Sequence, residues 1–413
     1  MDGRADQAYL PIPEGAVTGF SGTLAQDSSL SQRGDTVLRV SLRGVSSART
    51  GIAATARGLA LIFVTGDYRF SMGEILSFRA GLTRYDGQGA ETFVGRAGRA
   101  EVARSGYAGR IWQARAEARE WLHRAVSEAG YPASALMDAL LVGSREDVPA
   151  ALNEGFQRTG SLHILALSGL HVSVIYGLLS GLLGFLRGRL PKFLAATAVL
   201  LFYQFLAGFM PSLLRATAMI LAGGIGLLLD RDAEPINLLA ISGIGILLAD
   251  PFQAFSLSFQ LSYLALAGIL AIGPLVKRPL EGLVPPVLLA PLALSIGAQA
   301  ATLPLVVARF GVYYPSGLVA SLVLVPLTTL FLWCGLAWLP LSAVPWPFLH
   351  EAGARVFGAL YAAIDGSARL LARLPGVMVG RDATPWVVGA STLLLLAAGS
   401  FLPARRAIPV AAR

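Results

Sequence analysis

The chain has 413 residues, of which 54% are hydrophobic and only 14% are charged, with a mean hydropathy of +0.62. Soluble domains carry roughly 25% charged residues, so this composition excludes an ordinary soluble protein and indicates a membrane protein. The net charge of +8 is unevenly distributed: residues 1–160 hold 18 Arg against 17 Asp and Glu, whereas residues 161–413 hold 15 Lys and Arg against 8 Asp and Glu. We therefore predict a water-exposed domain followed by a membrane domain whose loops are basic. The positive-inside rule gives membrane proteins such basic loops in general, so the net charge is weak evidence for nucleic-acid binding.

Residues 1–110 contain short segments in which apolar and polar residues alternate, separated by Gly, Asp and Ser. Examples are Thr36–Leu42, Gly58–Thr65 and Ile75–Leu82. This period predicts about five strands in a small antiparallel barrel or sheet, for which an OB-like barrel is one option. Oligonucleotide binding by such a barrel requires basic side chains beside exposed aromatic ones. The candidate contacts are Arg69, Arg79 and Arg84, beside Phe63, Tyr68, Phe70, Phe78 and Tyr85, although most of these aromatic residues are expected in the core.

Residues 111–160 are expected to form a bridge of amphipathic or interfacial helices. Ile111–Gly130 groups Trp112 and Trp121 with apolar residues at helical spacing, which suits a membrane interface. Ala133–Val142 predicts a short apolar helix ended by Gly143, and a third helix is expected from Pro149, capped by Asp147. All three helices are also compatible with a purely structural role.

Residues 161–413 are predicted to form a multi-span helical membrane domain, because a span needs roughly 20 apolar residues. Basic residues at Arg187–Lys192 and at Lys277 and Arg278 are expected to face the cytoplasm. This orientation places the N-terminal domain outside the membrane, so either further spans precede it in a longer protein or the orientation is reversed. The expected spans are 162–185, 193–209, 211–229, 235–249, 254–273, 286–308, 316–341 and 384–402, with Phe348–Leu374 as an amphipathic helix at the interface or along a wet cavity.

Several polar residues occur inside these apolar segments, where ionisable groups are candidate functional sites. For each one alone, hydrogen bonding between helices is the commoner explanation, whereas their presence on consecutive spans favours a polar pathway. We expect Ser168 and Gly169 to break the first span, His163 and His171 to turn inward at the break, and Arg215 to face it. The full set of expected pore residues is His163, Ser168, Gly169, His171, Arg215, Gln260, Ser262, Tyr263, Gln299 and Arg309.

The block at 139–175, ALLVGSREDVPAALNEGFQRTGSLHILALSGLHVSVI, resembles the signature of the ComEC family, the inner-membrane channel proteins of bacterial competence. Phe156, Thr159-Gly160, His163 and Ser168–His171 fill the family pattern. Further matches follow at PSLLRATAM (211–219), at DPFQAFSLSFQLSYLALAG (250–268) and at Gln299 with Thr302-Leu303-Pro304. The resemblance implies a multi-pass protein of the bacterial inner membrane that translocates single-stranded DNA into the cytoplasm, beside a DNA receptor and a helicase motor, with a homo-oligomer as one possibility.

Two departures from the family qualify this resemblance. Many members carry leading spans, and many end in a metallo-β-lactamase-like domain, whose HxHxDH metal motif does not occur in this sequence. DNA cleavage and a cofactor are therefore not expected. A metal site built on His163 and His171 is also not expected, because their spacing places them about 80° apart on a helix.

Two other functions remain open. One is a transporter of a small anionic solute, which would bind at the ends of broken helices. The other is an intramembrane hydrolase, in which Ser168 and His171 would be hydrogen-bonded on one helical face. No third group that would orient the histidine is evident in the sequence, so the channel interpretation, without catalysis, is preferred.

Overall fold

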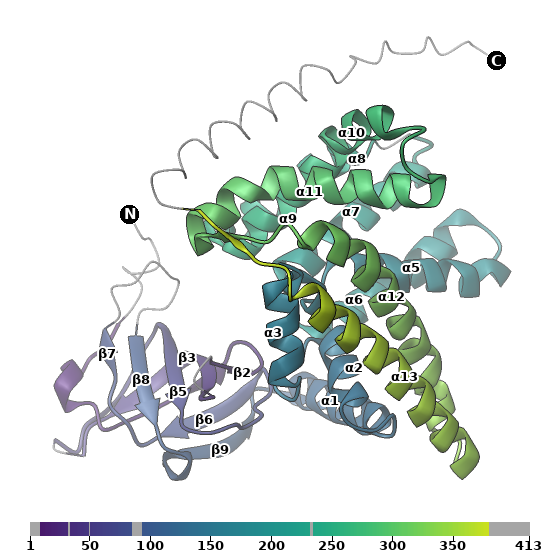
Figure 1. The fold of residues 1–413 in the computed structure, drawn as a ribbon. Helices are drawn as coiled ribbons and strands as arrows, with labels where there is room; N and C mark the ends of the chain where they lie inside the picture. The colour runs from purple at the N-terminus through teal and green to yellow at the C-terminus, as the bar shows by residue number, and fades with distance from the viewer. Residues whose placement is uncertain (1–8, 32–33, 49, 85–92, 232–233, 380–413) are drawn as a thin grey trace. The chain divides into compact units, whose positions relative to one another are not determined.

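The computed structural model describes residues 9–31, 34–48, 50–84, 93–231 and 234–379 (Figure 1). It contains an N-terminal β-sheet domain and a helical C-terminal region, as predicted. The chain divides into two compact units. One comprises the residues up to Val148 together with Phe205–Gly208 and Trp338–Ala354, and the other comprises the remaining residues.

The N-terminal sheet has more strands than the five predicted, because several are only two or three residues long. Its main path runs in the order β7-β8-β5-β3-β1-β6-β9, with β2 and β4 paired to β3. The pairing is antiparallel except between β5 and β8, which are parallel, so the predicted all-antiparallel arrangement is wrong at this one ladder. The strands are β1 (Gly19–Leu24), β2 (Ser29–Leu30), β3 (Thr36–Ser46), β4 (Ala53–Thr55), β5 (Leu59–Val64), β6 (Glu74–Phe78), β7 (Thr83–Arg84), β8 (Phe93–Ala97) and β9 (Val102–Tyr107).

The sheet encloses an apolar core on one face. Along β5 buried and half-buried residues alternate, because successive side chains of a strand point to opposite faces. Leu38 and Val40 of β3 are fully buried, and the rings of Phe20 and Phe78 stack at 4.6 Å. Of the aromatic residues considered for oligonucleotide binding, Phe70 and Phe78 belong to this core and Phe63 and Tyr68 are half-buried, while Tyr85 lies outside the described residues.

Three helices follow the sheet: α1 (Arg110–Ser127), α2 (Ala133–Val142) and α3 (Ala150–Arg158). Their extents agree with the sequence periodicity. The start of α3 differs from the prediction, because Pro149 itself is the N-cap residue and Asp147 does not cap the helix. The Asp147 side chain instead forms an ion pair with Arg69.

The second region consists of helices of very different lengths (Figure 1). They are α4 (Leu162–Leu165), α5 (Gly169–Leu182), α6 (Arg189–Ala207), α7 (Pro211–Leu228), α8 (Pro235–Ala249), α9 (Leu257–Ala271), α10 (Gly273–Leu280), α11 (Pro286–Phe310), α12 (Gly317–Ser342) and α13 (Pro347–Leu371). A short ladder joins β10 (Val312–Tyr313) to β11 (Val377–Met378). The 3-10 helices are Glu14–Ala16, Arg99–Glu101, Leu183–Phe185 and Pro251–Phe255.

Four of these helices, α6, α7, α11 and α12, are long and apolar enough to cross a membrane. The pair α9 and α10, bent by 43°, could form a fifth span. The predicted span 162–185 is broken into α4 and α5, and 235–249 forms a helix of only 15 residues, α8. The predicted span 384–402 lies outside the described residues.

Helices α9 and α11 approach each other closely because glycines face each other at their contact. A Cβ atom on Gly268 would lie 2.2 Å from the carbonyl oxygen of Gly297 and 2.6 Å from the Cβ of Ala301. Small residues at such a contact allow two backbones to meet, which is the usual packing of helices in lipid. This contact holds α9, which carries three of the predicted pore residues, at a fixed position against α11.

Candidate functional site

The first apolar segment of the helical region breaks at Ser168. Helix α4 ends at Leu165, and α5 begins at Gly169 with Ser168 as its N-cap residue. The Nδ1 atom of His171 accepts the backbone N–H of Ser168 at 2.9 Å and lies 3.0 Å from its Oγ atom. These contacts form a capping box, in which the third helical residue satisfies the backbone of the cap. His171 is therefore buried and held at the break, whereas the His163 side chain remains solvent-accessible.

Two contacts join this break to helix α7. The hydroxyl of Ser212 donates to the carbonyl oxygen of Leu167 at 2.7 Å. The guanidinium of Arg215, one turn further along α7, lies against Gly169, where a Cβ atom would be only 2.7 Å from Nη2. A side chain at position 169 would require the flexible Arg215 head group to shift away from the start of α5.

The Arg215 guanidinium is only partly satisfied. Its Nη1 atom donates to the backbone carbonyl oxygen of Ser262 on α9. Its Nε–H is buried and has no hydrogen-bond partner, and among the described residues Arg215 has no ion pair with a carboxylate. A buried donor of a charged group that lacks an acceptor is costly unless an anion or water meets it, so the unsatisfied Nε–H leaves capacity for a further acceptor at this place.

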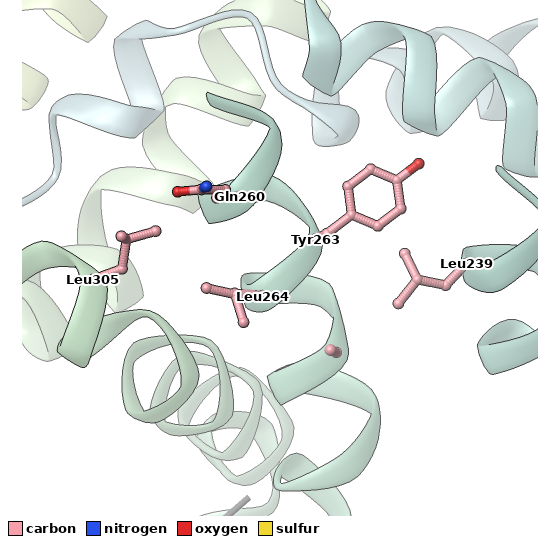
Figure 2. Close-up of a pocket in the computed structure, with 6 residues that line it drawn as sticks. Leu239, Gln260, Tyr263, Leu264 and Leu305 are labelled. Carbon is pink, nitrogen blue, oxygen red and sulfur yellow. The ribbon is translucent and has the colours of Figure 1, made fainter. Parts of the chain in front are cut away.

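Helix α9 presents a pocket next to these residues, with a volume of about 420 Å³. The ring of Tyr263 lies on the side of α9 toward Leu239, and Gln260 and Leu264 lie on the side toward Leu305 (Figure 2). The Tyr263 hydroxyl is 3.1 Å from the Ser242 Oγ atom. The side-chain amide of Gln260 donates to the carbonyl oxygen of Ala254 at 2.8 Å, so it satisfies a backbone acceptor of the 3-10 helix that precedes α9.

The structure therefore brings together Ser168, Gly169, His171, Arg215 and Ser262, with Tyr263 adjacent on α9. Gln260 lines the same pocket as Tyr263, whereas Gln299 and Arg309 have other surroundings. The carbonyl group of Gln299 accepts from the Tyr313 hydroxyl at 3.1 Å, and Arg309 is exposed at the end of α11.

In the other unit the structure reveals a buried ion pair that the sequence did not suggest. The Arg115 side chain is fully buried and donates to both oxygens of Asp27, at 2.8 and 2.7 Å, and to the carbonyl oxygens of Phe205 and Leu206. Burial by itself raises the pKa of Asp27, but the hydrogen bond from Arg115 and the charges of Arg119 and Arg115 outweigh it, and the pKa is lowered. Asp27 and Arg115 are far apart in the sequence, so no local sequence pattern predicted their pairing.

The three arginines proposed as oligonucleotide contacts differ in their surroundings. Arg79 and Arg84 are exposed near the ends of β6 and β7. The guanidinium of Arg69 pairs with Asp147 and lies 3.4 Å from a carboxylate oxygen of Glu146. Arg69 thus already has anionic partners within the chain, and a nucleic acid would have to compete with them.

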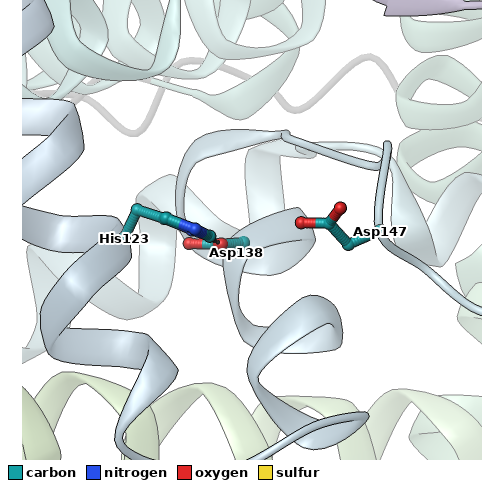
Figure 3. A group of neighbouring side chains, drawn as sticks. All are labelled: His123, Asp138 and Asp147. Carbon is teal, nitrogen blue, oxygen red and sulfur yellow. Dashed lines mark hydrogen bonds and ion pairs between the residues drawn. The ribbon is translucent and has the colours of Figure 1, made fainter. Parts of the chain in front are cut away.

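A second group missed by the sequence lies around His123 on α1. Its Nδ1 atom is hydrogen-bonded to Asp138 on α2, and Asp147 follows in the next loop (Figure 3). Burial raises the pKa of Asp138 above its usual value, although His123, Arg69 and Arg119 act in the opposite direction. One ligand atom from each of His123, Asp138 and Asp147 lies within 4.8 Å of the others. The prediction that the chain has no metal site considered other histidines only.

The family assignment rests on the helical region. A family model described as "Competence protein" matches residues 140–406, which include the break at Ser168 and Arg215. The chain belongs to this competence protein family, of the ComEC type. Together with the candidate spans, membership indicates a multi-pass membrane protein.

Among curated proteins, this competence family member is similar to an uncharacterized protein of Aquifex aeolicus (strain VF5). The two are 31% identical over 190 residues, which are 46% of this chain and 43% of the relative. The match thus spans less than half of the relative's length. No solved structure matches the chain significantly.

Proposed function

We propose that the chain is a multi-pass component of the bacterial cytoplasmic membrane that conducts single-stranded DNA into the cell during natural transformation. Its membership in the competence protein family and its four or five candidate spans support this proposal. The DNA strand would pass beside the break between α4 and α5, where α5, α7 and α9 meet. In this proposal the chain is a conduit and carries out no catalytic step.

The observation that carries the proposal is the incompletely satisfied guanidinium of Arg215. It lies in a helical region with no carboxylate paired to it among the described residues, and its Nε–H lacks an acceptor. The N-terminus of α5 lies beside it at Gly169, and helix N-termini attract anions because their first N–H groups and the helix dipole point at the ligand. A phosphodiester oxygen matches both sources of positive charge.

The remaining groups at this place suit a passing strand better than a tightly held ligand. Only one formal charge is present, and the other polar groups are hydroxyls and backbone atoms of Ser168, Ser262 and Tyr263. A conduit needs contacts weak enough to release its cargo, and a tyrosine ring can stack on any base because every base has a π-face. The proposal therefore predicts passage that depends little on base sequence.

The test is transformation frequency in a naturally competent host in which this chain replaces the resident competence protein. Arg215→Ala is expected to lower transformation at least 100-fold at unchanged protein level, and Arg215→Lys is expected to retain part of it because the charge remains. Arg187→Ala, which removes an exposed arginine elsewhere in the helical region, is the matched control and is expected to be neutral. Normal transformation by Arg215→Ala would refute the proposed site.

A transporter of a small anionic solute is the main alternative, and the same Arg215 observation favours it. The two functions differ in the ligand that Arg215 would bind, which is single-stranded DNA in one case and a small anionic solute in the other. If the solute interpretation is right, transformation by Arg215→Ala stays normal while uptake of an anionic solute fails.

An intramembrane serine hydrolase is the other alternative and rests on the 3.0 Å contact between Ser168 Oγ and His171 Nδ1. The same nitrogen accepts the Ser168 backbone N–H, so its lone pair is shared with a structural cap. Labelling of Ser168 by a fluorophosphonate probe would support the hydrolase, and no labelling is expected.

The proposal extends to the partners of the chain. A DNA receptor would deliver the strand, a cytoplasmic helicase would pull it, and a homo-oligomer is compatible with both. Arg79 and Arg84 of the sheet domain would contact the DNA backbone before it enters the helical region. Their replacement by Ala is expected to reduce transformation less than Arg215→Ala does, because exposed phosphate contacts are individually weak.

A further inference from the structure

The His123 cluster defined above carries an inference that is independent of DNA passage. Its members come from three separate segments of one compact unit: His123 from α1, Asp138 from α2 and Asp147 from the loop after α2. The imidazole of His123 points at the Asp138 carboxylate, and the Asp147 carboxylate faces the same place from the other side (Figure 3). A nitrogen and two carboxylates with ligand atoms within 4.8 Å of one another form a donor set that metal ions of intermediate softness prefer.

The decisive residue of the cluster is Asp138. Its side chain is only 4% exposed, and it belongs to α2, whose other residues are almost all buried apolar side chains. One of its carboxylate oxygens binds His123, and the other, Oδ1, is buried without any hydrogen-bond partner. A buried oxygen that bears charge and has no partner is costly, and a cation bound there would remove that cost.

The guanidinium of Arg69 already provides a positive charge on the solvent side of the His123 cluster. The Nη1 atom of Arg69 lies 3.1 Å from Nε2 of His123, and its Nη2 atom pairs with Asp147. Nearby Glu146 adds a third carboxylate, with an oxygen 3.4 Å from Arg69 Nε. Asp147 and Glu146 thus both pair with one guanidinium, and the Arg69 side chain is 42% exposed, so it can leave without unfolding its surroundings.

We propose that His123, Asp138 and Asp147 bind a divalent transition-metal ion of the zinc class in exchange for the Arg69 guanidinium. In the ion-bound form His123 carries its proton on Nε2, the nitrogen that Arg69 vacates, and turns the lone pair of Nδ1 toward the ion. The two aspartates each contribute one oxygen. Three protein ligands leave a coordination position for water or an external oxygen ligand, and the ion fixes the loop that contains Glu146 and Asp147 against α1 and α2.

The experiment is zinc binding to the purified, untagged full-length chain in detergent, after treatment with a chelator, measured by titration calorimetry with ZnCl2. We expect one Zn²⁺ per chain, displaced by neither equimolar MgCl2 nor CaCl2, because those ions prefer all-oxygen sites. Asp147→Asn and His123→Ala are each expected to weaken binding at least tenfold. Circular dichroism establishes that both variants are folded, and Asp147 is partly exposed, so its replacement is the milder change.

The converse variant separates a metal site from a simple ion-pair network. Arg69→Ala removes the competing cation and is expected to tighten zinc binding severalfold, whereas a network held by Arg69 would only lose stability. His350→Ala and Arg43→Ala, which change another histidine and another exposed arginine of the same unit, are matched controls expected to bind as the unaltered chain does. Absence of stoichiometric zinc in both the unaltered chain and Arg69→Ala, or zinc retained in Asp147→Asn and His123→Ala, would overturn the proposal.

Discussion

The sheet domain and the helical region dispose their apolar residues in opposite ways. In the sheet domain, Leu38 of β3 is fully buried and arginines such as Arg43 are exposed. In the helical region, large apolar side chains such as Phe202 and Leu330 are about half exposed on candidate spans, and the close helix contact is made by glycines. Exposed apolar side chains of this kind favour lipid as the surroundings of the helical region, since helices in lipid gain nothing by hiding apolar groups.

The two regions also differ in how an arginine with buried donor atoms is compensated, Arg115 being fully buried and Arg215 partly buried. Arg115 in the first unit donates to both oxygens of Asp27 and to two carbonyl oxygens, so its charge is compensated within the chain. Arg215 in the second unit reaches a single carbonyl oxygen and retains a free buried N–H. The first arrangement stabilises a fold, and the second leaves binding capacity for a ligand.

The largest expected effect follows from removing the partner of the compensated arginine. Asp27→Asn leaves the Arg115 charge buried without compensation, and breaking a buried pair in this way typically destabilises a protein by about 3–5 kcal/mol. Chemical denaturation followed by the fluorescence of the sheet-domain unit measures the loss. A change below about 1 kcal/mol would show that Arg115 is solvated and that the comparison between the two arginines is wrong.

The same pair predicts a pH dependence with a definite sign. The pKa of Asp27 is lowered in the folded protein, so its stabilising contribution is complete above the unfolded value of about 3.9 and is lost as the pH falls through the folded value. The difference in unfolding free energy between the unaltered chain and Asp27→Asn is therefore expected to shrink below about pH 4. A difference that stays constant from pH 7 to pH 3 would contradict the lowered pKa.

The glycine contact between α9 and α11 gives the next largest effect. Gly268→Val places side-chain atoms where a backbone carbonyl lies, and since backbone cannot swing away, we expect a loss of about 3 kcal/mol, at the upper end of overpacking. Thermal unfolding in detergent measures it. Gly245→Val on α8, where a Cβ meets nothing within 4 Å, is the matched control, and equal losses in both variants would show that the contact is not close.

A similar loss is expected when a charge is placed on the outer face of a candidate span. Leu330 lies near the middle of α12 and is 49% exposed, so Leu330→Arg would place a cation in lipid, at about 3 kcal/mol by insertion scales. The amount of protein in the membrane fraction is expected to fall. Ser41→Arg, on an exposed position of β3, is expected to be neutral, and tolerance of both changes would argue that α12 does not face lipid.

The smallest effect concerns a buried carboxylate of the sheet domain. Burial raises the pKa of Glu74, against the opposing Ser71 N–H and Arg104, and its Oε2 atom lies 3.5 Å from Arg104 Nε but has no hydrogen-bond partner. A raised pKa means that the protonated form is the one favoured by folding, so its contribution is lost as the pH rises through the folded value. Glu74→Gln is therefore expected to raise the melting temperature slightly at pH 8 and to have no effect at pH 4; a lowered melting temperature at pH 8 would contradict this.

Local sequence patterns were sufficient for the elements but not for the partnerships between them. The alternation in β3 and the helical period of α1 and α2 follow from which faces meet apolar surroundings, and this information is written in adjacent residues. Ser168-Gly169 was recognisable as a helix start because a cap residue followed by glycine interrupts an apolar run. The strand count was too low, because ladders of two residues such as β7 carry no periodic signal.

The site itself was only partly visible in the sequence. The juxtaposition of Gly169 and Arg215 depends on how α5 and α7 pack, and the pair of Asp27 with Arg115 joins residues far apart in the chain. His123, Asp138 and Asp147 likewise come from three segments whose spacing matches no metal motif. Arg69 was noticed for its charge, but its carboxylate partners could be identified only from the fold.

Photo-crosslinking during DNA uptake tests the central claim most directly. A photoreactive amino acid would replace Tyr263, beside Arg215, or Leu248, an exposed residue of α8, in competent cells supplied with labelled DNA. The account predicts crosslinks to single-stranded DNA from position 263, their loss when Arg215→Ala is added, and none from position 248. DNA crosslinked equally at both positions, or at neither while transformation proceeds normally, would contradict passage of the strand beside Arg215.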